Sequence, residues 1–196
     1  MKTALVILAA LTSFACSAPD RRYAQVVVEN EELQEATGEA ISNWQKAVGS
    51  EIDWVLSNSC DDSSRTCVKV RLSKTNDSPP VPDAVKDTHP KAIVGGYTDG
   101  HVADVSMDRT EIITILPWYL GHPAVKLFSL VTHEMGHALG IKHLNPDGKS
   151  GEPDFDVMYP IASESGHDCI GPLTLQAYDN YYGSCSMQGD CKTFCW

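Results

Sequence analysis

The chain has 196 residues, of which 42% are apolar and 21% are charged, and its formal net charge is -11. This length and composition are typical of one globular domain, or of two closely packed subdomains. The acidic charge argues against nucleic acid or an anionic membrane surface as the partner, because both would repel the protein.

The first 18 residues have the pattern of a secretory signal peptide. Lys2 gives a short positive start, and residues 4–11 form an apolar run that is too short to span a bilayer. We therefore expect residues 1–18 to be a leader and residues 19–196 to form a single domain. Cys16 weakly resembles the lipidated cysteine of a bacterial lipobox. Free secretion and anchoring at a periplasmic or outer surface thus both stay open.

Six cysteines follow the leader, an even number that suits three disulfides outside the cytosol. Cys60 and Cys67 flank a short polar loop, and we expect them to pair with each other. The other four allow three pairings, and the sequence does not choose among them: Cys169, Cys185, Cys191 and Cys195.

Hydrophobic periodicity predicts alternating helices and strands along the chain. Apolar residues recur at helical spacing from Leu33 to Val48, with Asn30 as the candidate N-cap and Gly49 as the stop. Residues 19–22 are expected to form a mobile lead-in. The predicted strands cover residues 52–56, 68–72, 92–98 and 102–107, and residues 111–116 form either a strand or the start of a helix.

Two further helices are predicted in the second half of the chain. One has apolar residues at helical spacing from Val125 to Leu139 and ends at Gly140. The other covers residues 173–182 and ends at Gly183, before a short cysteine-rich tail.

The first of these two helices carries His133, Glu134 and His137. Side chains four residues apart lie on the same face of a helix, so the two imidazoles can converge on one metal ion. Glu134 lies beside that position, where its carboxylate can take a proton from an attacking water. Gly140 allows a sharp turn after the helix, which can bring His143 to the same ion.

Three protein ligands leave one position of a tetrahedral zinc ion open, as in catalytic zinc sites. A closed structural site would need a fourth cysteine or histidine nearby. His122 and His167 have no suitable spacing, and the cysteines after the leader can all be paired. The pattern therefore favours catalytic zinc with Glu134 as the general base.

The segment His133-Glu134-Met135-Gly136-His137-Ala138-Leu139-Gly140-Ile141-Lys142-His143 resembles the zinc-binding motif of the metzincin metallopeptidases. Met158, within Val157-Met158-Tyr159-Pro160, is similar to the methionine that lies beneath the zinc in that clan. Within the clan the chain is most similar to the matrixins, which share Met-Tyr-Pro and a terminal helix ending in Tyr-Gly. It departs from them in having Leu144 where serine is usual, and we recognise no cysteine-switch motif in the sequence.

This resemblance implies an α+β fold with a twisted mixed sheet and two long helices above it. Residues 23–140 would form this upper subdomain, and residues 141–196 a small irregular lower one with the C-terminal helix. A protein or peptide substrate would lie extended along the edge strand at residues 92–98, where Gly95 and Gly96 would allow close approach. Tyr159 would assist catalysis, line the pocket or simply pack, and residues from Ile161 onward would form a pocket wall.

The predicted protein is thus a monomeric, secreted or surface-anchored zinc endopeptidase. Two other functions stay open, a non-catalytic secreted binding module and a zinc amidase acting on a non-peptide substrate. Calcium is a weaker expectation, at Asp147, Asp154 and Asp156, which are more typical of a solvated loop. A further hypothesis is that Asp20 reaches the zinc before processing near Arg21 and Arg22.

Overall fold

A computed structural model describes residues 20–77, 79–81, 83, 94–99, 110–121, 126–144, 156–159, 169–183, 185 and 191–196. The signal-peptide prediction, the strand expected at residues 102–107 and the pocket wall expected from Ile161 lie outside these residues. None of the described helices is long and apolar enough to cross a membrane.

A five-stranded mixed sheet forms the centre of the fold, in the order β2-β1-β3-β5-β4. Four strands are parallel to their neighbours, and only β4 runs antiparallel, beside β5. In chain order the strands are β1 (Tyr23–Val28), β2 (Asp53–Ser57), β3 (Thr66–Leu72), β4 (Gly96–Asp99) and β5 (Thr110–Ile115). The mixed α/β architecture agrees with the α+β expectation.

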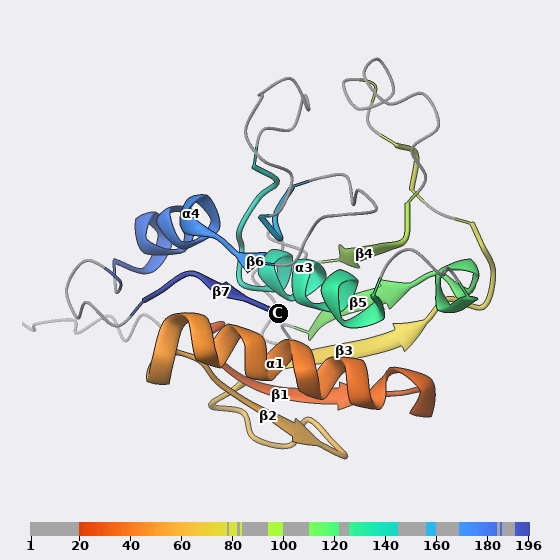
Figure 1. The fold of residues 1–196 in the computed structure, drawn as a ribbon. Coiled ribbons are helices and arrows are strands. Elements are labelled where there is room, and N and C mark those ends of the chain that lie inside the picture. The colour runs from red at the N-terminus through yellow and green to blue at the C-terminus, as the bar shows by residue number, and fades with distance from the viewer. Residues whose placement is uncertain are drawn as a thin grey trace, which may run out of the picture.

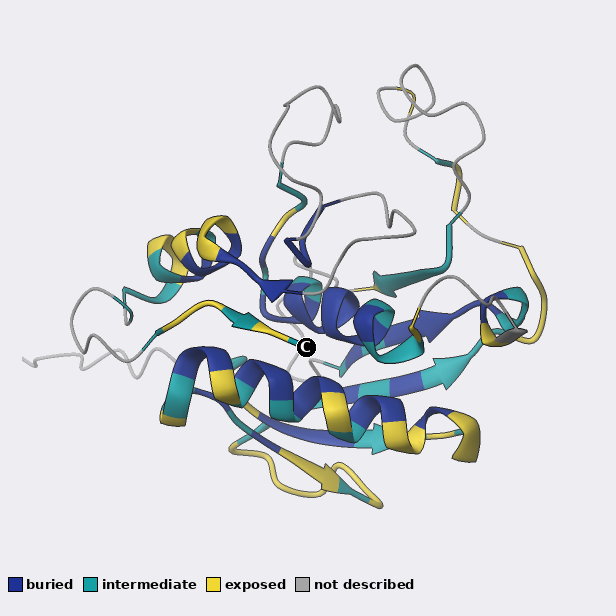
Figure 2. Ribbon diagram, in the orientation of Figure 1, coloured by how far each residue is buried: buried dark blue, intermediate teal, exposed yellow. Residues whose placement is uncertain are grey.

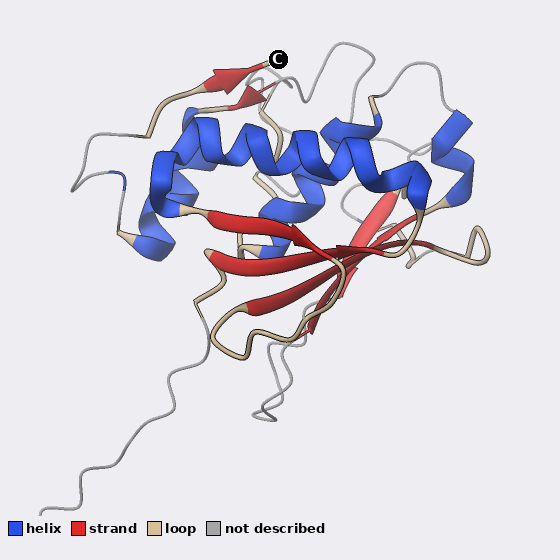
Figure 3. Ribbon diagram, turned by 90° about the horizontal axis from the view of Figure 1, so that it is seen from below, coloured by secondary structure: helices blue, strands red, loops and turns tan. Residues whose placement is uncertain are grey.

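Two long helices, α1 (Gln34–Val48) and α3 (Leu127–Ala138), cover one face of the sheet (Figures 1 and 3). Every third or fourth residue of α1 is apolar, and this stripe is buried (Figure 2). Trp44 is fully buried at its centre, and its indole Nε1–H donates to the carbonyl oxygen of Thr132, 2.9 Å away. This bond joins the two helices at the level of the candidate site.

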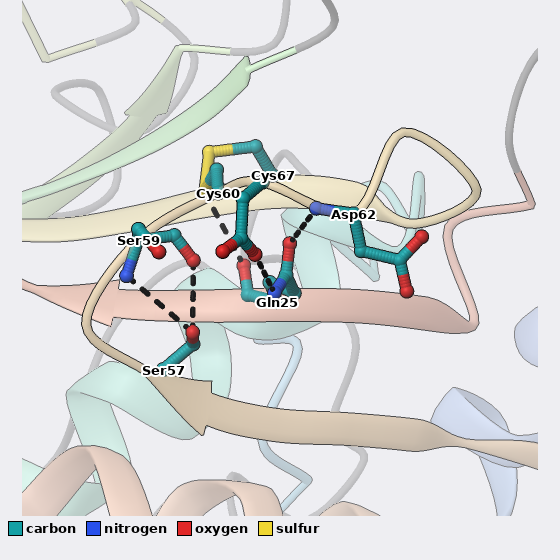
Figure 4. The surroundings of a disulfide bond; sticks show 7 residues. Gln25, Ser57, Ser59, Cys60, Asp62 and Cys67 are labelled. Atoms are coloured by element: carbon teal, nitrogen blue, oxygen red, sulfur yellow. Dashed lines mark hydrogen bonds between the residues drawn. A yellow bond between two sulfur atoms is a disulfide. The ribbon is translucent and has the colours of Figure 1, made fainter.

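The first strand, β1, was missed by sequence reasoning. Its helix-facing residues Ala24 and Val26 are fully buried, but Gln25 between them is also only 9% exposed. On the other face of the sheet, Gln25 accepts a hydrogen bond from the amide of Asp62 and donates one to Asp61 (Figure 4). The loop that carries these aspartates covers Gln25. Both faces of β1 are therefore buried at this point, and burial does not alternate along the strand as it does in a half-buried one.

Asn30 does not cap a helix, contrary to expectation. It precedes the short 3-10 helix η1 (Glu31–Leu33), and its side chain makes no capping bond there. Its Oδ1 instead accepts a hydrogen bond from the amide of Leu72, at the end of β3. The three predicted glycine stops are confirmed, because Gly49, Gly140 and Gly183 have φ of 65°, 88° and 66°, which favours glycine.

Three disulfides are present, as predicted. Cys60 pairs with Cys67 across the loop beside Gln25 (Figure 4). The structure resolves the open pairing with two further bridges, Cys169–Cys195 and Cys185–Cys191. Three bridges indicate an oxidising environment such as the extracellular space.

The C-terminal part of the chain folds back onto the helices. Helix α4 (Pro172–Tyr182) follows strand β6 (Cys169–Ile170), which pairs with β7 (Phe194–Cys195). At the end of the chain, the indole of Trp196 donates to the hydroxyl of Ser129 on α3. The tail therefore closes over the outer side of the helical layer.

Candidate metal centre

Helix α3 positions two of the three predicted ligands. It packs between α1 and strands β4 and β5, so most of its side chains are buried. His133 and His137 lie one turn apart on this helix, with their ring centroids 4.7 Å apart. The helical spacing alone therefore brings the two imidazoles together, as the sequence predicted.

The end of α3 delivers the third histidine. Gly140 has a φ of +88°, and its amide donates to the carbonyl oxygen of His137 at 2.8 Å. The amide of Ile141 then donates to the carbonyl oxygen of Gly136 at 2.9 Å, which closes the helix end. This turn leads the chain back toward α3, and His143 reaches the other two rings.

The three Nε2 atoms face one another. The Nε2 of His143 lies 3.2 Å from that of His133 and 3.0 Å from that of His137. These three histidines form the one group of metal-ligating side chains found within the described part of the chain. The three histidines could therefore hold a metal ion.

Backbone carbonyls orient two of the rings. The Nδ1 of His133 lies 2.5 Å from the carbonyl oxygen of Val157, and that of His137 lies 2.8 Å from that of Ile141. A carbonyl oxygen can only accept, so each Nδ1 carries the proton and each Nε2 presents a lone pair. Burial also lowers the pKa of His137, which favours the neutral ring that a metal requires.

The donor set fits a small divalent cation. Three lone-pair nitrogens this close would repel one another unless a cation or a proton lay between them. Zinc–nitrogen bonds of about 2.0–2.1 Å at tetrahedral angles place nitrogens about 3.3–3.4 Å apart, close to the spacing found here. Imidazole suits several transition metals, so the donor set by itself does not choose among them.

Glu134 lies on the same helix, with its carboxylate directed at β4. The side chain is 3% exposed, and burial raises the pKa of this carboxyl group to about 7. The hydroxyl of Thr98 on β4 opposes this increase, because it donates to Oε2 of the carboxylate at 2.7 Å. A cation held by the histidines would also lower this pKa.

Gly95 and Gly96, where we expected close approach of a substrate, are already approached closely by side chains of the protein itself. A Cβ atom at Gly95 would lie 2.6 Å from the ring of Tyr119, and one at Gly96 would lie 3.3 Å from Oε1 of Glu134. The chain's own side chains thus approach the strand closely at both positions. Substrate contact at Gly95 and Gly96 stays a prediction.

Met158 lies against α3 between the two helical ligands. It is fully buried, and a Cβ atom at Gly136 would collide with its sulfur atom. The carbonyl oxygen of Met158 accepts a hydrogen bond from the amide of Leu144, next to His143. Met158 thereby contacts both the helix and the loop that carry the histidines.

Tyr159 directly follows this methionine and is 5% exposed, with its amide donating to the carbonyl oxygen of Asp156. Packing accounts for this burial, and a role toward substrate stays a prediction.

Asp156, one of the three suggested calcium ligands, has a structural role. Its carboxylate is 2% exposed and accepts hydrogen bonds from the amide and the hydroxyl of Thr174 in the first turn of α4. A side chain at Gly171 would collide with the same carboxylate. Asp156 therefore caps α4 from outside the helix. The other two suggested calcium ligands, Asp147 and Asp154, lie outside the described residues.

The predicted mobile lead-in and the Asp20 switch are also not found. Arg22 takes the Asp20 carboxylate in an ion pair and binds Glu51 at 2.7 Å, and Arg21 binds the buried Glu111 at 3.2 Å. Asp20 does not belong to the group that gathers at the histidines. Ion pairs anchor this segment, which the polar sequence around it did not reveal.

Thr98 is a candidate functional residue that the local sequence pattern did not reveal. Thr98 is two positions after Gly96, so period-two alternation would have placed both on one face of the predicted strand. The contact with Glu134 itself joins residues 36 apart in the chain, and no local pattern encodes it.

No protein-family model matches the sequence, and no curated protein is significantly similar to it. The assignment of function therefore depends on the residues and geometry of this site.

Proposed function

We propose that this protein is a secreted zinc-dependent endopeptidase that resembles the matrixins. The single observation that carries the proposal is the meeting of three Nε2 lone pairs, two of them from the helix that also carries the buried carboxylate of Glu134. The spacing of the ligands and the intervening Gly140 agree with the metzincin motif. Met158 packed under α3 agrees with the methionine turn of that clan.

His133, His137 and His143 would hold the zinc ion through Nε2. When bound, zinc supplies a positive charge that acidifies water and polarises a carbonyl group. Glu134 would accept the proton of the attacking water and then give it to the leaving amine. The carbonyls of Val157 and Ile141 keep two of the rings in the required tautomer while this occurs.

Strand β4 offers a docking edge for an extended peptide. It lies at the end of the five-stranded sheet. The amide of Leu116 donates to the carbonyl oxygen of Gly95, so these two form a hydrogen-bonded pair of the antiparallel ladder. Because such pairs alternate, the backbone groups of Gly96 and Thr98 are directed away from β5. A peptide strand could pair with them by β-augmentation.

The decisive experiment compares the wild type with Glu134→Gln, which keeps the shape of the side chain and removes the base. We expect the zinc-loaded wild type to cleave a mixed peptide library and the variant to lose at least about 100-fold in kcat/KM. Glu35→Gln, on the exposed face of α1, is the matched control and should behave as the wild type. Removal of metal by a chelator should abolish cleavage, and zinc should restore it.

Each failure of this experiment has a distinct meaning. A zinc-loaded wild type that leaves all peptides intact would contradict the peptidase proposal. If that protein still bound peptides, it would be the non-catalytic binding module. If it cleaved only small amides, it would be the zinc amidase. Equal cleavage by the Glu134→Gln variant would remove Glu134 from the mechanism.

A further inference from the structure

The contact between β4 and α3 involves more than packing. The hydroxyl of Thr98 lies 2.7 Å from Oε2 of Glu134 and 3.0 Å from the backbone carbonyl oxygen of the same residue. Within the described part of the chain, Thr98 is the hydrogen-bond partner of this carboxylate. A strand at the edge of the sheet therefore contacts the candidate general base directly.

The two carboxylate oxygens have different surroundings. Gly96 and Thr98 lie on the same side of β4, because side chains alternate along a strand. At Gly96 the missing side chain leaves room for Oε1, which lies 3.3 Å from the position that a Cβ would take. At Thr98 the hydroxyl holds Oε2. Strand β4 thus binds one oxygen through Thr98 and places no side chain against the other at Gly96.

A donor at this place has a clear physical purpose. A buried carboxylate that lacks a hydrogen-bond donor is poorly solvated and turns toward any alternative partner. A hydrogen bond to an ionised group is stronger than one between neutral groups, so a single hydroxyl can fix the orientation of the side chain. Catalytic groups lose much of their effect when they are misplaced by about 1 Å.

We propose that Thr98 is a positioning residue, which holds Oε2 of Glu134 so that Oε1 serves as the proton acceptor. This inference rests on the proposed peptidase function. It assigns a task to β4 in addition to any pairing with substrate. The carbonyl contact at 3.0 Å gives the hydroxyl a second, purely structural partner, and the experiments must separate the two roles.

The first test uses steady-state kinetics with Thr98→Val and Thr98→Ser. Valine keeps the shape of threonine and removes the hydroxyl, whereas serine keeps the hydroxyl. We expect Thr98→Val to lower kcat by about 10- to 100-fold with KM changed less than about twofold, because the base is misplaced while substrate binding is kept. Thr98→Ser should recover most of the activity, and zinc content should match the wild type in both variants.

Two kinetic results would overturn the inference. One is a Thr98→Val protein with the kcat of the wild type. The other is a loss of activity that follows a loss of zinc, since the threonine would then support the fold of the site and not the base. In both cases the wild type remains active, so the proposed peptidase function would stand.

The second test does not depend on activity. A double-mutant cycle on the metal-free protein combines Thr98→Val with Glu134→Ala and measures thermal unfolding. We expect Thr98→Val to lower Tm by about 2–6 °C in the wild type and by less in the Glu134→Ala protein, which keeps the backbone carbonyl partner of the hydroxyl but lacks the carboxylate. Equal losses in both backgrounds would overturn the inference. Coupling in a protein without peptidase activity would instead reject the proposed function alone.

Discussion

The sheet with its two helices and the segment after Ile141 are stabilised by different interactions. Residues of β1, β3, β5, α1 and α3 form most of the apolar core, which periodic patterns in the sequence make visible. The later segment adds fewer residues to this core, such as Val157, Met158 and Tyr178, and it is also held by individual polar contacts and disulfides. The candidate metal centre lies where the two parts meet, since α3 carries two ligands and the loop after it carries the third.

This difference matters for the ligands. His133 and His137 are fixed by a helix that is packed on both sides, whereas His143 follows a turn. The carbonyl of Val157, which orients His133, comes from the later segment. The regular part therefore supplies the histidine spacing, and the irregular part supplies the partners that aim the rings.

The largest expected effect comes from the disulfide of the later segment. Loss of the Cys169–Cys195 bridge in a double serine variant frees a loop with a sequence separation of 26, compared with 7 for Cys60–Cys67. In the chain-entropy view, the first change costs about 3.5 kcal/mol and the second about 2.4 kcal/mol of unfolding free energy. Urea unfolding of both double variants tests this order. The reverse order would mean that the two parts do not differ as described.

A somewhat smaller effect is expected at Asp156. Replacement by alanine leaves the amide and hydroxyl of Thr174 without their acceptor in a buried place, at a cost of roughly 3 kcal/mol. The matched control is Asp77→Ala in an exposed loop, which should change the unfolding free energy by less than about 0.5 kcal/mol. Chemical denaturation measures both. Similar small losses would show that α4 does not depend on this cap.

The smallest expected changes in stability come from alanine substitutions at two glycines in helices, and these two changes have opposite signs. An alanine at Gly136 would press into Met158, so we expect Gly136→Ala to destabilise the protein by about 2 kcal/mol and to weaken metal binding at the three histidines. Gly38→Ala in α1 meets only ordinary contact, with Leu56 at 3.7 Å, and should stabilise by about 0.5–1 kcal/mol through higher helix propensity. Thermal unfolding and a zinc titration measure these changes. A stable Gly136→Ala protein with normal zinc affinity would place Met158 outside the support of the site.

Local patterns predicted much of this molecule. The three α-helices, strands β2, β3 and β4 and the convergence of the three histidines follow from residue spacing, because they depend on helix and strand geometry near each residue. The features that the sequence did not predict depend on contacts between residues far apart in the chain. Gln25 is buried by a distant loop, Asn30 binds the end of β3, and Thr98 meets Glu134 across 36 residues. The choice among cysteine pairings likewise needed the pairing of β6 with β7.

The ion pairs of Arg21 and Arg22 fix the start of the described chain, and this limits how far the domain could lie from a lipid attached before it. Arg21 binds Glu111, and Arg22 binds Glu51. The guanidinium of Arg22 also lies 5.0 Å from the ring centre of Tyr182. The hydroxyl of Tyr182 in turn donates to the carbonyl oxygen of Leu139, just before the turn to His143. A lipid attached at Cys16 would be four residues from Asp20, a reach of at most about 14 Å. Under the proposed function, an anchored form would cleave polypeptides exposed close to the bilayer, whereas a released form would have no such restriction.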